Sequence, residues 1–310
     1  MNPLYYQPSG RFTVVGIILL LLGGLVAAVP LAFAYTYGVW YIPFIYLNFF
    51  FTVIFGGLLG WVLRKLVVAG KLRNPALAGL LGALVGVWGW YVQWCVYITL
   101  LAGAGEVEEF GSRFSVAHTA FEFEAFLYYL TNPGEVLSIL PALAENGTWT
   151  LFKVTVSGVF LYLIWLVEFV IIVGFSWLLT RNKAKEPFSE MAGQWAEKVT
   201  LPRPAAHFAD TTATTAALEA ADWNHLQLHP TDLSDTAPHG RLHFYRAPAD
   251  PDCCYLSLEN VTFELDKDGK ASEKTADVLE YLRVPPQAFQ ELNARFSAVQ
   301  EVQQEQQASS

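Results

Sequence analysis

Charged residues are missing from long stretches of the first part of this chain of 310 residues. No Asp, Glu, Lys or Arg occurs in residues 12–63 or in residues 74–105. Over the whole chain 15% of the residues are charged and 54% are hydrophobic, whereas about a quarter of the residues of a typical soluble protein are charged. Helices in a soluble core do not need charge-free runs of this length, which excludes an ordinary water-soluble fold for this part.

Cysteine is scarce as well, with three residues in the chain. Cys95 lies inside a hydrophobic run, and Cys253 and Cys254 are adjacent. This number excludes a disulfide-rich secreted scaffold and suits a reducing environment around the C-terminal part. The C-terminal part also lacks a Gly-rich phosphate loop and a nucleophile elbow, so we expect no enzyme activity.

The hydrophobic runs are long enough for four membrane crossings. Each predicted helix is close to the ~20 residues that cross the ~30 Å hydrocarbon layer of a bilayer. Gly38 and Pro43 punctuate the first run and divide it into two helices. The expected helices cover residues 13–36, 43–66, 76–101 and 154–180. We therefore predict a membrane all-α domain over residues 1–181, built as a four-helix transmembrane bundle.

The basic residues near the helix ends predict which side of the membrane the termini occupy. Four crossings place both termini on one side. On that side the helices are flanked by eight basic residues: Arg11, Arg64, Lys65, Lys71, Arg73, Arg181, Lys183 and Lys185. The opposite side has Arg113 and Lys153. By the positive-inside rule we expect a multi-pass protein of the plasma (inner) membrane with both termini in the cytoplasm.

A cleaved signal peptide is an alternative for the start of the chain. Ala32-Phe33-Ala34 has the small-x-small pattern that a signal peptidase reads. The apolar run is longer than the usual ~7–15 residues of a signal peptide, however, and Arg11 is the single charge before it. Removal of residues 1–34 would leave the expected orientation of the other three helices unchanged.

Small residues recur four positions apart in the predicted helices, for example at Gly56 and Gly60 and at Gly82 and Gly86. Lipid gives two helices no hydrophobic reason to associate, so small residues that let helix backbones approach closely favour packing. We expect these faces to pack within one chain. The same spacing would also serve a homo-oligomer, and the spacing alone does not separate the two.

The segment 102–153, on the outer side, is too long to be a simple turn. Residues 116–130 are apolar and aromatic, but Glu122 and Glu124 make a further crossing unfavourable. Asn132-Pro133 is typical of a helix start. We expect two short helices on the outer membrane surface, one within 116–130 and one that follows Asn132.

The composition changes abruptly after Arg181. Residues 186–310 contain nine basic and twenty acidic side chains, a net charge of −11. This balance argues against binding to nucleic acid and to the anionic inner leaflet. We predict a small cytoplasmic α+β C-terminal domain over residues 182–300, followed by a disordered tail at 301–310.

Alternating apolar residues predict three strands in this domain, and capping and proline signals predict three helices. The expected strands cover residues 241–247, 255–265 and 275–284. The expected helices cover residues 187–195, 211–222 and 287–300. The last two strands should form a hairpin around Gly269, because glycine tolerates the positive φ of a tight turn.

Glu168 is the one charged residue of the fourth predicted helix and falls near its middle. An ionised carboxylate at that depth costs at least ~2.5 kcal/mol, so its side chain should face protein or water. Counting helical turns places Tyr91 and Gln93 nearest to it, with Asn48 and Thr52 nearer the outer face. Glu168 is therefore either a proton- or cation-binding residue or a neutral acid that hydrogen-bonds between helices.

Possible zinc ligands are concentrated in the C-terminal domain. They are His225, His229, His239, His243, Cys253 and Cys254. His225 and His229 are four residues apart, which suits one face of a helix. Adjacent cysteines point to opposite sides of a strand, however, so Cys253 and Cys254 cannot both bind one metal ion from regular geometry. The alternatives are a zinc site and scattered surface histidines.

These observations favour a non-enzymatic membrane protein whose bundle anchors a cytoplasmic domain, which binds a protein partner or acts as a regulatory domain. The lipid bilayer is its expected surrounding, and nucleic acid is not an expected partner. The first alternative is a small proton- or cation-coupled transporter or channel subunit that uses Glu168. The second is a membrane-tethered metalloenzyme that uses the cluster from His225 to Cys254.

Overall fold

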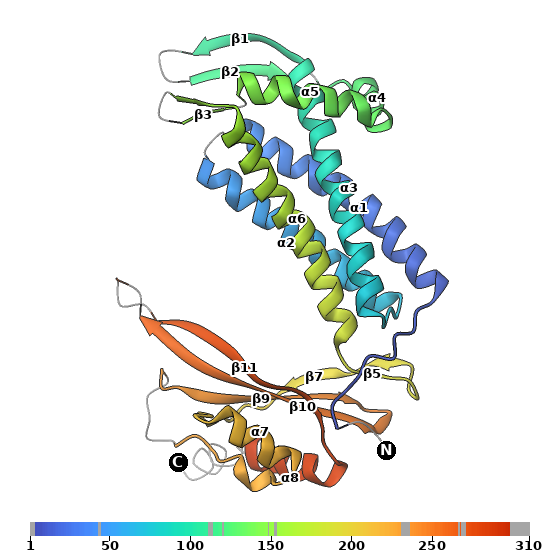
Figure 1. Ribbon diagram of the computed structural model, residues 1–310, viewed down its shortest axis with the longest axis vertical. Coiled ribbons are helices and arrows are strands. Elements are labelled where there is room, and N and C mark those ends of the chain that lie inside the picture. The colour runs from blue at the N-terminus through green and yellow to red at the C-terminus, as the bar shows by residue number, and fades with distance from the viewer. Residues whose placement is uncertain are drawn as a thin grey trace, which may run out of the picture. The chain divides into compact units, whose positions relative to one another are not determined.

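The computed structural model describes residues 4–42, 45–110, 114–119, 121–147, 149–151, 154–230, 236–265, 267 and 271–297. The chain divides into two compact units (Figure 1). One unit is Gly10–Lys185, and the other joins Met1–Ser9 to Glu186–Ser310. Each unit is described separately below.

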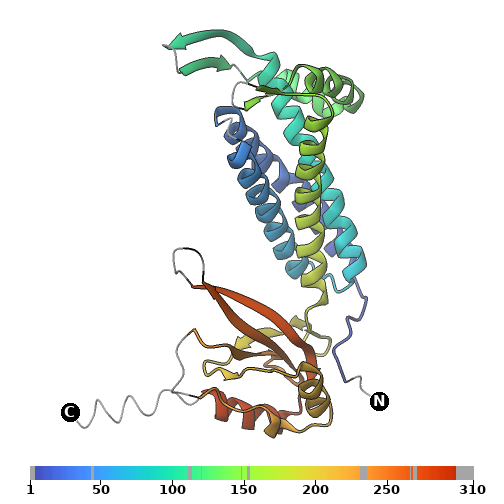
Figure 2. The same ribbon diagram turned by 60° about the vertical axis from the view of Figure 1, so that its left-hand side comes forward.

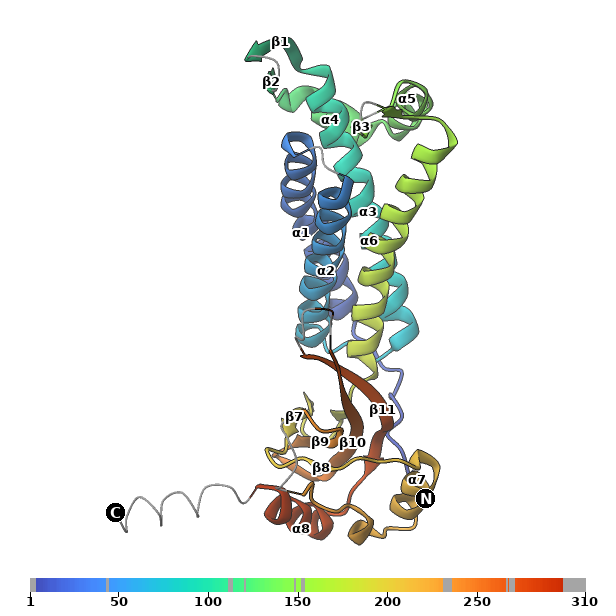
Figure 3. The same ribbon diagram turned by 90° about the vertical axis from the view of Figure 1, so that its left-hand side faces the viewer.

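The first unit is built around four long helices that lie alongside one another (Figures 1 and 3). They are α1 (Val14–Tyr41), α2 (Ile45–Ala69), α3 (Pro75–Ala102) and α6 (Val159–Lys185). All four are long and apolar enough to cross a membrane, which confirms the prediction of four candidate spans. The Thr13 and Asn74 side chains accept hydrogen bonds from Gly16 N and Leu77 N, which fixes where α1 and α3 begin.

The four helices are arranged around a square. α1 packs against α2 and α3, and α6 packs against the same two helices. α1 and α6 therefore lie at opposite corners and are bridged by the other pair.

Small residues set the distance between α6 and its two neighbours. A Cβ atom added to Gly56 of α2 would lie 3.1 Å from Ile172 Cα. One added to Gly82 of α3 would lie 2.5 Å from Ser176 O and would overlap Thr180 Oγ1. The small-residue faces of α2 and α3 are thus occupied by α6 of the same chain.

α6 begins later than predicted. Val154–Val156 forms strand β4, which pairs antiparallel with β3 (Trp149–Leu151). Gly158, in the left-handed region at φ 66°, then turns the chain into the helix. The expected start at residue 154 is wrong because residues 154–156 pair with β3 as a strand. Their hydrophobic character alone had assigned them to the helix.

The segment between α3 and α6 contains the two expected short helices, α4 (Phe123–Thr131) and α5 (Pro133–Asn146). Pro133 occupies the first turn of α5, as predicted. The helix predicted within residues 116–130 begins at Phe123. Before it, the backbone of β2 (Phe114–Thr119) pairs antiparallel with that of β1 (Ala104–Phe110) in a local hairpin that the sequence did not predict.

The second unit is an antiparallel sheet covered by helices on one face. Its strands are β7 (Glu197–Thr200), β8 (Ala205–Ala206), β9 (His239–Ala247), β10 (Asp250–Leu265) and β11 (Ala271–Arg283). The order is β11-β10-β9-β7, and β8 also pairs with β9. The hairpin of β10 and β11 projects beyond the other strands (Figure 2). All three predicted strands are present.

Helices α7 (Thr211–Glu219) and α8 (Pro286–Ser297), both predicted, pack on the sheet together with a 3-10 turn at Trp223–His225. Asp210 caps α7 by accepting a hydrogen bond from Ala213 N. The buried core on this face includes Phe244, Leu282 and Phe296. The opposite face carries a smaller cluster around Tyr245 and Cys253.

The expected helix at residues 187–195 is wrong. The segment forms a small hairpin of β5 (Phe188–Ser189) and β6 (Gln194–Trp195). Gly193 has φ 63°, and Ser189 Oγ accepts a hydrogen bond from Ala192 N, so this segment turns back on itself. The predicted turn around Gly269 and the predicted disordered tail at 301–310 lie outside the described residues.

We expect Gly82→Ala to destabilise the helical unit by about 1–3 kcal/mol, because the added methyl group overpacks the contact with α6. The matched control is Gly57→Ala on α2, since a Cβ there meets no atom within 4 Å. The control should be neutral or gain up to about 1 kcal/mol from the higher helix propensity of alanine. Thermal unfolding of the purified chain in detergent measures both, and equal midpoints for the two variants would contradict this packing.

Candidate functional site

Glu168 lies on α6, nine residues after the helix begins at Val159, which is about 14 Å along the axis. Because α6 begins later than predicted, Glu168 is nearer to the α4–α5 end of the bundle than to its middle. Its carboxylate is placed among side chains of two other helices, α1 and α2.

A chain of polar contacts connects Glu168 to α1 and α2. The Tyr35 hydroxyl of α1 lies close enough to the Glu168 carboxylate to interact with it. Tyr35 Oη also lies 3.3 Å from Thr52 Oγ1, which donates to the carbonyl oxygen of Asn48 at 2.8 Å. The contact between Tyr35 and Glu168 therefore joins the two helices that lie at opposite corners of the bundle.

Asn48 is the other polar side chain at this site. It is 6% exposed, and its Oδ1 atom is buried without a hydrogen-bond partner among the described residues. A buried polar atom left unpaired costs about 1–3 kcal/mol, so the structure carries an unmet acceptor at this point.

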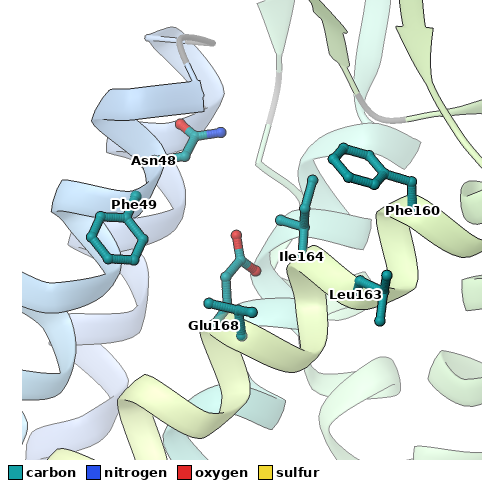
Figure 4. A pocket seen from close by; sticks show the side chains of 7 residues that line it. Asn48, Phe49, Phe160, Leu163, Ile164 and Glu168 are labelled. Carbon is teal, nitrogen blue, oxygen red and sulfur yellow. The ribbon is translucent and has the colours of Figure 1, made fainter.

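Asn48 and Glu168 line the same cleft between α2 and α6, which has a volume of about 260 Å³. In Figure 4 the carboxylate of Glu168 and the amide of Asn48 project into this space from the two helices. The remaining lining side chains are apolar: Phe49, Phe160, Leu163, Ile164 and Val167. The arrangement places a carboxylate in an apolar cleft, and this carboxylate can bind a donor.

The structure separates the other predicted partners from Glu168. Tyr91 instead donates its hydroxyl hydrogen bond to Tyr129 O of α4, at 2.6 Å. Gln93 is buried on α3, where its backbone carbonyl oxygen lies 3.3 Å from Thr36 Oγ1. Neither residue lines the cleft as the described residues define it.

Sequence reasoning missed Tyr35. The available signal was a hydroxyl within the apolar first helix, next to Thr36. The count of helical turns considered partners on the second and third helices, whereas the polar contact crosses the bundle from the first.

The histidines and cysteines of the second unit are dispersed. His243 Nδ1 lies 2.8 Å from Thr200 Oγ1, and His225 Nε2 lies 3.3 Å from Thr214 Oγ1. The rings of His229 and His239 contact each other, with centroids 5.8 Å apart. Within the described parts of the chain, no group of three or more His, Cys, Asp or Glu side chains could hold a metal ion.

Cys253 and Cys254 lie on opposite faces of the sheet. Cys254 belongs to the large core beneath α7 and α8, and Cys253 to the small cluster around Tyr245. Burial raises the pKa of the Cys253 thiol to about 11 and that of the Cys254 thiol to about 12. Both thiols are therefore protonated at neutral pH, which disfavours metal binding and nucleophilic chemistry.

His243 belongs to an ion-pair network on β9, β10 and β11. Its Nε2 atom lies 3.1 Å from Glu259 Oε1, and Arg241 bridges Glu259 and Glu273 at 3.0 and 2.9 Å. Burial lowers the pKa of His243 below its usual value, and the Glu259 carboxylate offsets part of this shift. Burial alone would raise the pKa of Glu259, but His243 and Arg241 together lower it.

The first residues of the chain bind to the edge of the sheet. Tyr5 pairs antiparallel with Leu282 of β11, Tyr6 N donates to Tyr281 O at 3.0 Å, and Arg283 N donates to Leu4 O at 2.8 Å. We call this short added strand, Leu4–Tyr6, the N-terminal clasp. It extends the sheet beyond β11.

Side chains reinforce the clasp on both faces of the sheet. The Tyr5 hydroxyl donates to Glu219 Oε1 of α7 at 2.6 Å. The Tyr6 ring packs against Tyr255 and Tyr281, with centroids 5.3 and 6.4 Å away. Tyr281 has φ 55°, unusual for a bulky residue, at an irregularity in the pairing of β10 with β11. The clasp thus binds where β11 is bulged.

Comparison with known protein families, curated proteins and solved structures gives no match to this chain.

We expect the stability of the second unit to fall as the pH drops below about 6.5, the usual pKa of histidine, because His243 binds its proton less readily in the folded state than in the unfolded state. His243→Gln should flatten this part of the pH profile, measured as the thermal unfolding midpoint of the full chain. The control His225→Gln removes a histidine that contacts Thr214 rather than Glu259. The same pH dependence in the His243 variant and the parent chain would contradict the assignment.

Proposed function

We propose that this protein is a multi-pass membrane anchor that holds an α+β interaction and regulatory module at the cytoplasmic face of the plasma (inner) membrane. The observation that carries this proposal is the N-terminal clasp. It places the start of the chain in the same compact unit as residues 186–310.

The clasp gives the module two connections to the helices instead of one. Residues 7–13 connect the clasp to α1, and Glu186 and Pro187 connect α6 to β5. A domain at the end of a single linker moves freely, whereas one held at two points loses much of that freedom. Binding or modification that releases the clasp would remove the connection between the module and α1. The connection through α6 would remain.

The clasp also indicates how a partner could bind. An extended segment that adds a strand to a sheet edge is a common mode of peptide recognition. Among the described residues, strand partners on the outer edge of β11 are confined to its end at Leu282. The rest of that edge is exposed from Ala271 to Asp277.

The charge of that edge favours a basic partner. β11 carries exposed acidic side chains at Asp277 and Glu280. The net charge of −11 over residues 186–310 has the same sign. Charged residues on an edge strand also discourage aggregation, so the partner must supply complementary charge to pair there.

The clasp is tested by a disulfide between Tyr5→Cys and Leu282→Cys. The flanking hydrogen bonds make these two residues a non-hydrogen-bonded pair, whose Cα atoms generally lie about 4.5 Å apart, within disulfide range. The matched control pairs Tyr6→Cys with Leu282→Cys, because Tyr6 points to the other face of the sheet. Oxidation in native membranes should link the first pair, and linkage of both or neither would contradict the clasp.

The interaction role is tested by a photo-crosslinking residue at Asp277 in the full chain in its native membrane. We expect cross-links to a protein with a basic extended segment, and we expect Glu280→Lys to reduce them. The control position is Thr212, exposed on α7 and away from the β11 edge. Cross-links of equal yield at both positions, or no cross-links at Asp277, would contradict the proposed interaction role.

A further inference from the structure

The cleft between α2 and α6 contains a carboxylate in apolar surroundings. The Glu168 side chain projects into the cleft from α6, opposite the Asn48 side chain of α2 (Figure 4). A carboxylate has about four acceptor positions, and the Tyr35 hydroxyl can occupy one of them. The cleft therefore suits a ligand that donates hydrogen bonds to a carboxylate.

The apolar lining argues against an inorganic cation as that ligand. Hard cations such as Ca²⁺ take about 6–8 oxygen ligands. The polar side chains that line the described cleft are Asn48 and Glu168, and the other five are hydrocarbon. An anion is disfavoured by Glu168. An organic ammonium group requires fewer oxygens, and it brings carbon that the lining can contact.

The cleft opens on the surface that the helices present to their surroundings. Four of its lining residues are about half exposed: Phe49 (57%), Phe160 (58%), Leu163 (53%) and Val167 (49%). On an apolar helix of a membrane bundle such a surface faces lipid. A ligand can therefore enter sideways from the bilayer.

The volume limits how much of a ligand is enclosed. About 260 Å³ is slightly below the range of ~300–1,000 Å³ typical of pockets that enclose a whole drug-sized molecule. The cleft accommodates one end of an elongated molecule and leaves the remainder in the lipid. This matches an amphiphile better than a compact solute.

We propose that this cleft binds the protonated amino end of a single-chain alkyl amine or of an amine-bearing lipid. The ammonium group donates to the Glu168 carboxylate, opposite the Asn48 side chain, and Tyr35 holds the carboxylate in place. The alkyl chain runs past Phe160, Leu163 and Val167 into the bilayer. This site is independent of the clasp and of any partner of the soluble module.

The test uses radiolabelled dodecylamine and the full chain in phosphatidylcholine nanodiscs. Saturable binding is expected, with dodecanoate and dodecanol as poor competitors because the first lacks a donor and the second lacks the charge. Val167→Trp fills the cleft and should abolish saturable binding. Its matched control is Leu166→Trp, which changes the adjacent residue, 56% exposed and outside the cleft, and should bind like the parent chain.

Glu168→Gln should weaken binding at least ten-fold, because it removes the charge that holds the ammonium group. Equal affinity in the Glu168→Gln variant, equal competition by dodecanol, or unchanged binding in the Val167→Trp variant would overturn the proposal. If the Glu168→Gln variant fails to fold, the Val167→Trp variant still tests the proposal. Replacing phosphatidylcholine with phosphatidylethanolamine distinguishes the source, because a lipid ligand displaces dodecylamine and a free amine ligand leaves its binding unchanged.

Discussion

The close approach of α6 to α2 and α3 is the constraint on which the helical unit depends. Glycine lets the α6 backbone come within van der Waals distance of both neighbours, at Gly56 and at Gly82. Dispersion contacts and interhelical hydrogen bonds hold helices together in lipid, where there is no hydrophobic drive, and both require short distances. The same approach brings Glu168 within reach of Tyr35 across the bundle, so the polar chain depends on the packing.

The sequence predicted those features that come from composition and local periodicity. Charge-free runs identified four apolar helices, and alternation identified β9, β10 and β11, because burial on one side imposes these patterns directly. It failed at Phe114–Thr119, at Val154–Val156 and at Phe188–Trp195, where pairing between backbones overrides local preference. All three segments belong to local hairpins, and four of the six strands are only two or three residues long, too short for an alternating pattern to show.

Only part of the candidate site could be predicted from the sequence. Glu168 stands out because a charge in an apolar helix is expensive, and Asn48 lies at a depth that turn counting can reach. Tyr35 gives no such signal, since tyrosine is common in membrane helices and commonly lies at their ends. Tyr35 reaches Glu168 because α1 and α6 lie at opposite corners of the bundle. This arrangement arises only when the four helices pack together.

The N-terminal clasp also has a consequence for the order in which the protein is made. Tyr5 precedes all four apolar helices in the chain, and its pairing partner Leu282 follows them, 277 positions later (282 − 5). The sheet edge can therefore close only after all four helices have been made. If all four helices cross a membrane, the clasp and β11 lie on the same side, whereas one crossing more or fewer would separate them. In that case β11 would lack its end partner and the Tyr6 ring its aromatic neighbours, so closure of the sheet edge would require every helix to be inserted.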